Sequence, residues 1–337
     1  MKKTITVILM LALLCGCGSK QKEDDTIHIA LSVYDTSDPF IMEITQKLEK
    51  LSASSRGKEM VIDIYDGGES QTVQNSQMDE FIKKHYDMVW MNLVDRTAAS
   101  TIIEKGKKAN VPIVFFNREP VKSDMRLWNQ VYYVGSKSEQ GGILQGEIIL
   151  DEYLKHPDRI DKNQDGILQY VILEGELGHQ DASLRSDSCV KPLLEQHIPM
   201  ERLDSEVANW KKAQGRVQMQ TMLNKYKDQI EVVFSNNDEM ALGAISALEE
   251  TSYTSKVVGI DGTREALRAV ADHRLDGTVL NDAQMQAGYI YQISELVLNK
   301  ESVRSLPFNE WNQIHVDFVK ITPETISDIM KEKNLSY

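Results

Sequence analysis

Short apolar segments alternate with longer amphipathic segments from Ile27 onward. The apolar segments are rich in β-branched residues and are bounded by polar or turn-forming residues, which predicts β-strands. The predicted strands are Ile27–Val33, Met60–Tyr65, Met88–Leu93, Pro112–Phe116, Tyr132–Val134, Gln169–Leu173, Glu231–Phe234, Lys256–Ile260 and Gly277–Leu280. The segments with a helical period are Phe40–Ala53, Val73–Lys84, Ala98–Ala109, Gly141–Leu154, Met240–Glu250 and Glu265–Ala271. This alternation indicates βαβ units, and therefore an α/β fold built on doubly wound parallel sheets.

Polar residues directly follow several of the predicted strands. They include Asn117, Asn237, Asp261 and Asn281. Ligands of open parallel sheets bind outside the carboxyl ends of the strands, so these side chains would suit a hydroxyl-rich ligand. No glycine-rich dinucleotide fingerprint follows the first strand, and Gly67-Gly68 is an isolated pair rather than a phosphate-binding loop. The pattern therefore indicates a site for a neutral small molecule.

Length and charge narrow the class of protein further. The chain has 337 residues, which is about right for two domains. Its formal net charge is -13, which disfavours binding to nucleic acid because a phosphate backbone requires a basic surface. An acidic surface fits a freely diffusing protein with a neutral ligand, and we expect a monomer.

The N-terminus predicts the compartment. Lys2-Lys3 precedes the apolar run Ile5–Leu14, which is too short to span a bilayer and has the layout of a secretion signal. The run ends in Leu14-Cys15-Gly16-Cys17, which resembles the bacterial lipobox. We expect residues 1–16 to be a lipoprotein signal peptide, Cys17 to carry the lipid and residues 17–25 to form a flexible tether. A plain secreted protein cleaved nearby is the alternative. Either way the protein would be extracytoplasmic, anchored to the cell membrane or facing the periplasm.

Cys189 would be the only other cysteine after this processing, so no intrachain disulfide can form. It stands in a predicted helical stretch with no basic residue directly beside it. We therefore expect a small core residue rather than a nucleophile.

One loop has the spacing of a calcium site. Its oxygen-bearing positions 1, 3, 5, 7 and 9 are Asp161, Asn163, Asp165, the carbonyl of Ile167, and Gln169, with Gly166 at position 6. Position 12 is Ile172, so the bidentate carboxylate of an EF-hand must come from elsewhere in the chain. A strand rather than a helix follows, which predicts a calcium loop attached to an α/β domain. A polar surface turn is the alternative.

Further stretches stand in order along the chain: Asp38-Pro39-Phe40, residues 111–120, 132–135, 175–181 with Arg185, 230–233, 236–238 and 278–282. With the calcium loop, they resemble the periplasmic D-galactose/D-glucose-binding proteins, the receptors of ABC sugar importers, over nearly all of residues 27–335. The resemblance implies a type I periplasmic-binding-protein fold, with two Rossmann-like domains joined by three hinge strands. The expected domains are 26–136 plus 284–313, and 137–282 plus 317–337, with the third crossing near Gln313–Asp317.

The resemblance implies a monosaccharide site between the two domains. Asp38 and Asn117 would bind sugar hydroxyls from the first domain, and Asp38 would accept from the 4-hydroxyl, so that both galactose and glucose are tolerated. The sugar-binding residues expected from the second domain are His179, Asp181, Arg185, Asn237, Asp261 and Asn281. Phe40 and Trp210 would cover the faces of the ring. Taken singly, Asp38, Asn237 and Asp261 also fit helix caps.

The resemblance also completes the calcium site. Glu231 would supply the bidentate carboxylate beside Asp161, Asn163, Asp165, Ile167 and Gln169. Glu231 begins a predicted strand that leads to Asn237, so the ion would join the loop to a sugar-binding strand. We expect Ca2+ to have a structural role.

The implied function is capture of D-galactose or D-glucose by domain closure and delivery to the membrane subunits of an ABC permease. One alternative output is signalling, in which the closed form docks on a chemoreceptor or a sensor kinase. A glycosidase using Asp38 and Asp261 is a weaker alternative, because carboxylates in a sugar cleft are its only support. We therefore expect a binding protein and not an enzyme.

Overall fold

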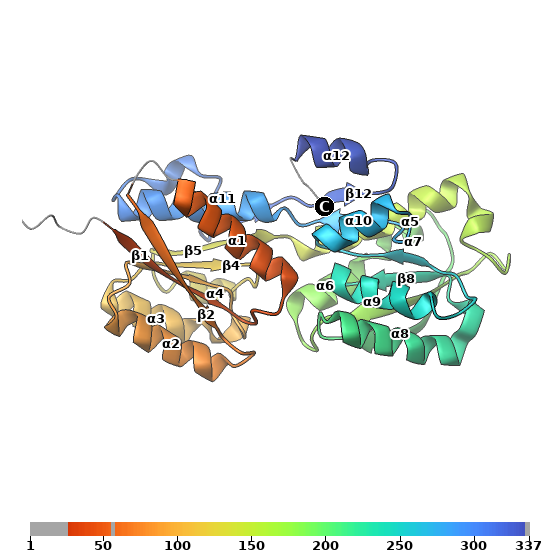
Figure 1. Ribbon diagram of the computed structural model, residues 1–337, viewed down its shortest axis with the longest axis horizontal. Coiled ribbons are helices and arrows are strands. Elements are labelled where there is room, and N and C mark those ends of the chain that lie inside the picture. The colour runs from red at the N-terminus through yellow and green to blue at the C-terminus, as the bar shows by residue number, and fades with distance from the viewer. Residues whose placement is uncertain (1–25, 55–57, 334–337) are drawn as a thin grey trace, which may run out of the picture.

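A computed structural model describes residues 26–54 and 58–333. It contains two lobes side by side, each with a sheet between layers of helices (Figure 1). The expected signal peptide, the lipidation site Cys17 and the tether 17–25 lie outside the described residues. Within the described ranges, no helix is long and apolar enough to cross a membrane.

The first lobe contains a parallel sheet with the strand order β11-β5-β4-β3-β1-β2. Its strands are β1 (Ile27–Val33), β2 (Met60–Asp66), β3 (Met88–Met91), β4 (Ile113–Phe116), β5 (Val131–Ser136) and β11 (Gln313–Val316). Its helices are α1 (Pro39–Ser54), α2 (Gln71–Lys83), α3 (Ala99–Ala109), α4 (Lys122–Met125) and α11 (Ala283–Leu298). Helices α1 and α11 cover one face of the sheet, and α2 and α3 cover the other (Figure 1).

Successive residues of β1 enter different cores. Ile29 and Leu31 pack in the cluster that contains Ile41 and Ile290, whereas Ala30 packs in the cluster that contains Phe81. A strand that is apolar on both faces is what a sheet covered by helices on both sides requires. The residues of β1 therefore form a nearly continuous apolar run.

The second lobe is built in the same way, with the strand order β7-β6-β8-β9. Its strands are β6 (Leu168–Glu174), β7 (Met200–Val207), β8 (Val232–Ser235) and β9 (Lys256–Val258), followed by the antiparallel pair β10 (Thr278–Leu280) and β12 (Val319–Ile321). Its helices are α5 (Ser138–Lys155), α6 (Gln180–Ser188), α7 (Lys191–Glu195), α8 (Lys212–Tyr226), α9 (Asp238–Leu248), α10 (Arg264–Ala271) and α12 (Ile326–Glu332). Short 3-10 turns occur at Arg96–Ala98, Pro157–Arg159, Lys227–Gln229 and Val303–Ser305.

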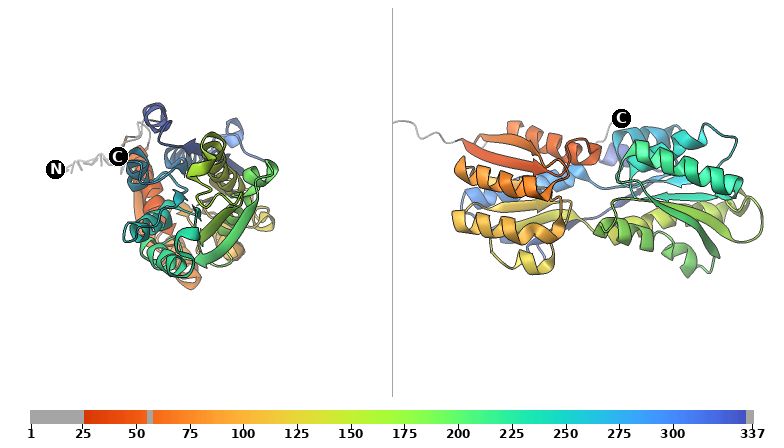
Figure 2. Two further views of the ribbon diagram at one scale, coloured as in Figure 1. Left: turned by 90° about the vertical axis from the view of Figure 1, so that its right-hand side faces the viewer. Right: turned by 90° about the horizontal axis from the view of Figure 1, so that it is seen from below.

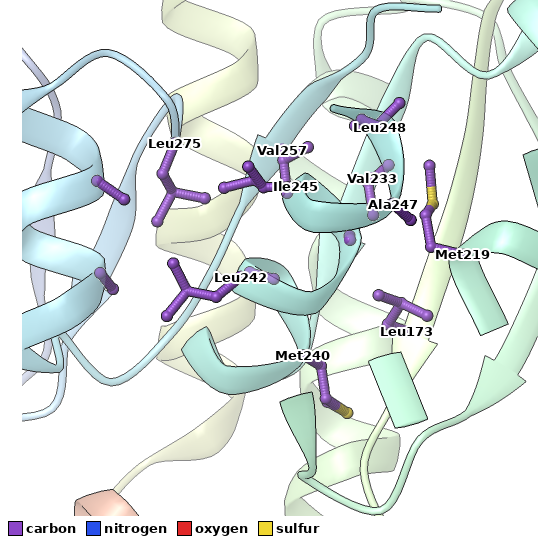
Figure 3. Packing of buried hydrophobic residues seen from close by; sticks show 14 of the residues in the cluster. Leu173, Met219, Val233, Met240, Leu242, Ile245, Ala247, Leu248, Val257 and Leu275 are labelled. Carbon is purple, nitrogen blue, oxygen red and sulfur yellow. The ribbon is translucent and has the colours of Figure 1, made fainter. Parts of the chain in front are cut away.

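The second sheet also separates two cores. Leu173 of β6 packs with Val233, Met219 and Ile245 on the side of α8 and α9 (Figure 3). Ile172 faces the other way, into the cluster that contains Cys189. Cys189 is fully buried, and burial raises the pKa of its thiol. The prediction that it is a core residue is confirmed.

The predicted strands and helices are all present, with small shifts at their ends. Strand β7, which lies at the edge of the second sheet, and the helices α4, α7, α8, α11 and α12 were not predicted. Strands β11 and β12 were not predicted either. No residue of β7 is buried: Glu201 and Arg202 are exposed and the other residues are partly buried, so the strand lacks the apolar run that marks its neighbours.

The described chain passes between the lobes at three places, which can be followed in Figure 2. It crosses after β5, between β10 and α11, and between β11 and β12. Because β11 pairs with β5 as far as Val316, this part of the first lobe ends at Val316 rather than at the expected boundary of 313. The third crossing is Asp317 and Phe318, between the two strands.

Candidate functional site

A cavity lies between the two lobes at the carboxyl ends of their strands. Residues from the first lobe that line it are Tyr34, Asp38, Phe40, Ile41, Asn117 and Arg118, and those from the second lobe are His179, Asp181, Arg185, Trp210, Asn237 and Asp261. The cavity holds about 350 Å³ of space free of protein atoms, including the part open to solvent. Polar side chains from both lobes line this space, so it suits a small polar solute. The structure brings together every predicted sugar-binding residue except Asn281.

Asp38 is held by three hydrogen bonds. Its Oδ1 accepts from the backbone amides of Phe40 and Ile41 at 2.9 and 3.1 Å, which is the N-cap geometry that the sequence also allowed. Its Oδ2 accepts from the hydroxyl of Tyr34 at 2.7 Å. Burial raises the pKa of Asp38, and the hydrogen bond from Tyr34 opposes this shift. The cap therefore fixes a carboxylate at the cavity wall, so structural and binding roles are compatible.

Asn117 follows β4 in the left-handed region, with a φ of 60°. Its backbone carbonyl accepts from the hydroxyl of Tyr133 at 2.8 Å, and its Oδ1 accepts from Nδ2 of Asn92 at 3.1 Å. Asparagine tolerates this backbone conformation better than most residues. These contacts fix the amide at the end of the strand.

Tyr34, Ile41 and Arg118 line the cavity but were not predicted as site residues. The guanidinium of Arg118 lies 3.8 Å from the centre of the Tyr34 ring and donates to the carbonyl of Val94 at 2.7 Å. Arg118 also pairs with Glu176 of the second lobe at 2.7 Å. Arg118 and Glu176 stand within stretches that carried the family resemblance, but their contact could not be predicted because they are far apart in the sequence.

His179 begins α6, and its Nδ1 accepts from the backbone amide of Asp181 at 3.1 Å. Burial lowers the pKa of His179 to about 4. The ring is therefore neutral at pH 7, and because Nδ1 accepts a hydrogen bond, the proton is on Nε2. The imidazole meets the ring of Trp210 edge-on at 5.2 Å between centroids. It can therefore act as a hydrogen-bond donor without carrying charge.

Trp210 has an unusual backbone and a tightly packed ring. Its φ is 63°, and its carbonyl accepts from Nδ2 of Asn237 at 3.1 Å. A Cβ added at Gly175 would lie 2.1 Å from Cζ2 of the indole, so only glycine allows this approach. Asn237 also caps α9 by accepting from the amide of Met240 at 3.0 Å. The predicted helix-cap role of Asn237 is thus present in a residue that lines the cavity.

Arg185 lies buried between two carboxylates. Its guanidinium nitrogens are 4.0 Å from Asp181 and 3.9 Å from Asp261, and Nη1 donates to the carbonyl of Asn236 at 2.7 Å. Its Nε has no hydrogen-bond partner. A buried donor without a partner is costly, and a polar ligand in the cavity would relieve that cost.

Asp261 is buried, and its pKa is raised well above the ordinary value by that burial. Arg185 opposes the shift, whereas Asp238 and Asp38 add to it. The cleft therefore gathers several carboxylates around one guanidinium. Such a site presents strong acceptors to ligand hydroxyls.

Asn281 does not line the cavity in this structure. Its Oδ1 accepts from Oγ of Ser136 at 2.8 Å and from Nε2 of Gln286 at 2.6 Å. Ser136 ends β5 and Gln286 stands in α11, so Asn281 joins two of the connections between the lobes. The backbone amide of Asn281 also donates to the carbonyl of Asp261 at 3.0 Å, and Asp261 lines the cavity.

The predicted calcium loop is compact. Oε1 of Glu231 accepts from the amide of Lys162 at 2.6 Å, and Oε2 accepts from the amide of Gln169 at 3.0 Å. Asp161 accepts from the amides of Asp165 and Gly166 at 3.2 and 3.0 Å. Glu231 therefore holds both ends of the loop through their backbone amides.

The donor chemistry of this loop fits calcium, since carboxylate, amide and carbonyl oxygens are the ligands of a hard cation. The carboxylates nevertheless accept from amides of the loop itself. Among the described residues, no group of three or more His, Cys, Asp or Glu side chains is placed to hold a metal ion. The calcium site stays a prediction.

Comparison with known proteins gives the family. A model of the periplasmic binding protein domain matches residues 29–302. The D-galactose/methyl-galactoside-binding periplasmic protein of Haemophilus influenzae is 31% identical over 335 residues, which cover 98% of this chain and 100% of that relative. The ribose import binding protein of Bacillus subtilis is 26% identical and covers 90% of this chain and 96% of its own length.

A solved structure has the same fold. The solute-binding protein of an ABC transporter from Bacillus halodurans, with bound myo-inositol, matches with a TM-score of 0.75 and 27% identity. The match covers 92% of this chain and 99% of that chain. The fold and cleft thus define a two-lobed α/β solute-binding protein, as the sequence predicted. This chain belongs to the periplasmic binding protein family, and it is a binding protein and not an enzyme.

Proposed function

We propose that this protein binds D-galactose or D-glucose between its lobes and delivers the sugar to the membrane subunits of an ABC importer. The observation that carries the proposal is the buried Arg185 between Asp181 and Asp261, whose Nε has no hydrogen-bond partner, in a cavity lined by both lobes. Carboxylate acceptors and charged donors satisfy sugar hydroxyls with charge-assisted hydrogen bonds. Trp210 and Phe40, from different lobes, offer apolar surface for the C–H faces of a pyranose ring.

The known relatives support a polyol ligand but differ in which one they bind. Their names specify galactosides, ribose and myo-inositol. The galactoside-binding relative covers nearly the whole chain at the higher identity, which favours a hexose. A site with several buried carboxylates also discriminates strongly, because a sugar that leaves one of them unpaired binds poorly.

The test is calorimetric titration of the purified protein with galactose, glucose, ribose, xylose and myo-inositol. We expect one-to-one binding of galactose or glucose, with weak binding of the pentoses. No heat with either hexose, from folded protein, would reject the proposal. Stronger binding of ribose or myo-inositol would keep the class of solute-binding protein and change its substrate.

Two accessory features complete the proposal. A lipid on Cys17 would keep the receptor beside its permease, and a Cys17→Ser variant would then move from the membrane fraction to the soluble fraction.

A Ca2+ ion held by Asp161, Asn163, Asp165, Gln169, Glu231 and the carbonyl of Ile167 would stabilise the second lobe. Calcium supplies charge neutralisation for buried carboxylates, and the chain supplies the loop that surrounds it.

A further inference from the structure

The Arg118–Glu176 pair joins the two lobes at the edge of the cavity. Arg118 lies between β4 and α4 of the first lobe, and Glu176 lies between β6 and α6 of the second. Nη2 of Arg118 is 2.7 Å from Oε1 of Glu176, and Nη1 is 3.2 Å from Oε2. Two parallel hydrogen bonds between a guanidinium and a carboxylate are a strong and directional contact. Because the partners belong to different sheets, the contact requires that the lobes lie together.

Arg118 is already fixed on its own lobe. Its guanidinium stacks on the Tyr34 ring and donates to the carbonyl of Val94. Because its guanidinium is already held in place, Arg118 loses little conformational freedom when it forms the contact with Glu176. Tyr34 in turn donates to Asp38, so direct contacts run from Glu176 to a carboxylate in the cavity wall.

A second ion pair between the lobes offers a comparison. Lys211 of the second lobe lies 2.5 Å from Glu69 of the first. These side chains are 41% and 50% exposed, whereas those of Arg118 and Glu176 are 4% and 32% exposed. Solvent screens the Lys211 contact, and exposed pairs contribute little. The Arg118–Glu176 pair is the one expected to matter energetically.

We propose that Arg118 and Glu176 act as a positioning pair that stabilises the closed arrangement of the lobes and thereby sets solute affinity and release rate. The inference rests on the proposed function, since it assumes that the solute binds between the lobes. Glu176 does not line the cavity, so its effect on affinity must pass through Arg118. A contact made only in the binding-competent arrangement raises the population of that arrangement and so lowers the apparent Kd.

The test is a double-mutant cycle with Arg118→Met, Glu176→Gln and the double variant, measuring the Kd and dissociation rate of the sugar. We expect Glu176→Gln to weaken binding about tenfold, mostly through faster dissociation. The double variant should bind about as weakly as Arg118→Met alone. The matched control pair, Lys211→Met and Glu69→Gln, should stay within about twofold of the wild type.

Wild-type affinity in Glu176→Gln, or independent effects of the two substitutions, would overturn the inference. If the wild type binds no sugar at all, the proposed function fails but the pair remains testable. The distance between spin labels on the two lobes of the unliganded protein is then measured. The inference requires longer distances in Glu176→Gln than in the wild type, and identical distributions would reject it.

Discussion

The hydroxyl of Tyr34 donates to Oδ2 of Asp38 at 2.7 Å, inside the cavity between the lobes. This bond supports the ionised form of a carboxylate whose pKa burial raises. A Tyr34→Phe variant loses that support, so the pKa of Asp38 should rise further. Since a sugar hydroxyl needs the carboxylate as acceptor, affinity should fall as the pH is lowered, and the fall should begin at a higher pH in the variant.

At pH 7 we expect Tyr34→Phe to bind the sugar about tenfold more weakly, the size of one hydrogen bond to a charged group. Titrations between pH 5 and 8 provide the measurement. Tyr132→Phe is the matched control, because Tyr132 packs against Phe308 outside the cavity. Superimposable pH profiles for Tyr34→Phe and the wild type would show that Asp38 does not depend on Tyr34.

Gly175 is expected to control the position of Trp210. A Gly175→Ala substitution places a Cβ within 2.1 Å of the indole, so the ring must move. We expect at least about tenfold weaker sugar binding, in line with the cost of overpacking, and an altered tryptophan emission spectrum. Gly288→Ala is the control, since a Cβ there meets nothing within 4 Å. Unchanged affinity in Gly175→Ala would mean that Trp210 does not contact the ligand.

Asp238 is expected to give stability an unusual pH dependence. Burial raises its pKa from 3.8 to about 6, although it accepts from Thr278 and from the amide of Thr263. In this case the folded state binds the proton more tightly than the unfolded state. The contribution of Asp238 to stability is therefore greatest below pH 4 and is lost as the pH rises through 6.

The difference between 3.8 and about 6 corresponds to about 3 kcal/mol. Urea denaturation of the wild type and of Asp238→Asn at pH 4 to 7 measures it. The stability of the wild type relative to the variant should decline over this range by up to that amount. A constant difference between the two proteins would indicate an ordinary pKa for Asp238.

The calcium proposal predicts a stability effect that requires Glu231. In saturating Ca2+ the wild type should melt roughly 5 °C higher than in EGTA, because a ligand bound only to the folded state stabilises it by a few kcal/mol. Glu231→Gln should lose most of this difference while keeping its sugar affinity. Glu201→Gln, at an exposed position of the same sheet, serves as control. Equal melting in calcium and EGTA for the wild type would remove the metal from the proposal.

The strands of both sheets were predictable where they are buried on both faces. Val89 and Val233 stand in short apolar runs that only a covered parallel sheet requires. Strand β7 was missed because it lies at a sheet edge, where Glu201 faces solvent. Hydrophobic periodicity reflects burial, so a strand at the edge of a sheet has only a weak periodic signal.

Only some residues of the candidate site could likewise be predicted from the sequence. Asn117 and Asp261 could be found because each follows a strand, and the carboxyl ends of parallel strands meet at the ligand site. Arg118 could not, since its role depends on a partner in the other lobe. Asn281 shows the limit of resemblance, which gives a position but not the hydrogen bonds that its side chain makes with Ser136 and Gln286.

The described chain crosses between its lobes three times, and these crossings determine what limited proteolysis of the protein can produce. A protease that nicks the chain after Ser136 leaves the lobes tied through the two remaining crossings, so the nicked product should migrate as one particle until it is denatured. Neither lobe is a continuous stretch of sequence, because β11 returns to the first sheet from the far end of the chain. Shortening the gene from one end therefore cannot leave one complete lobe on its own.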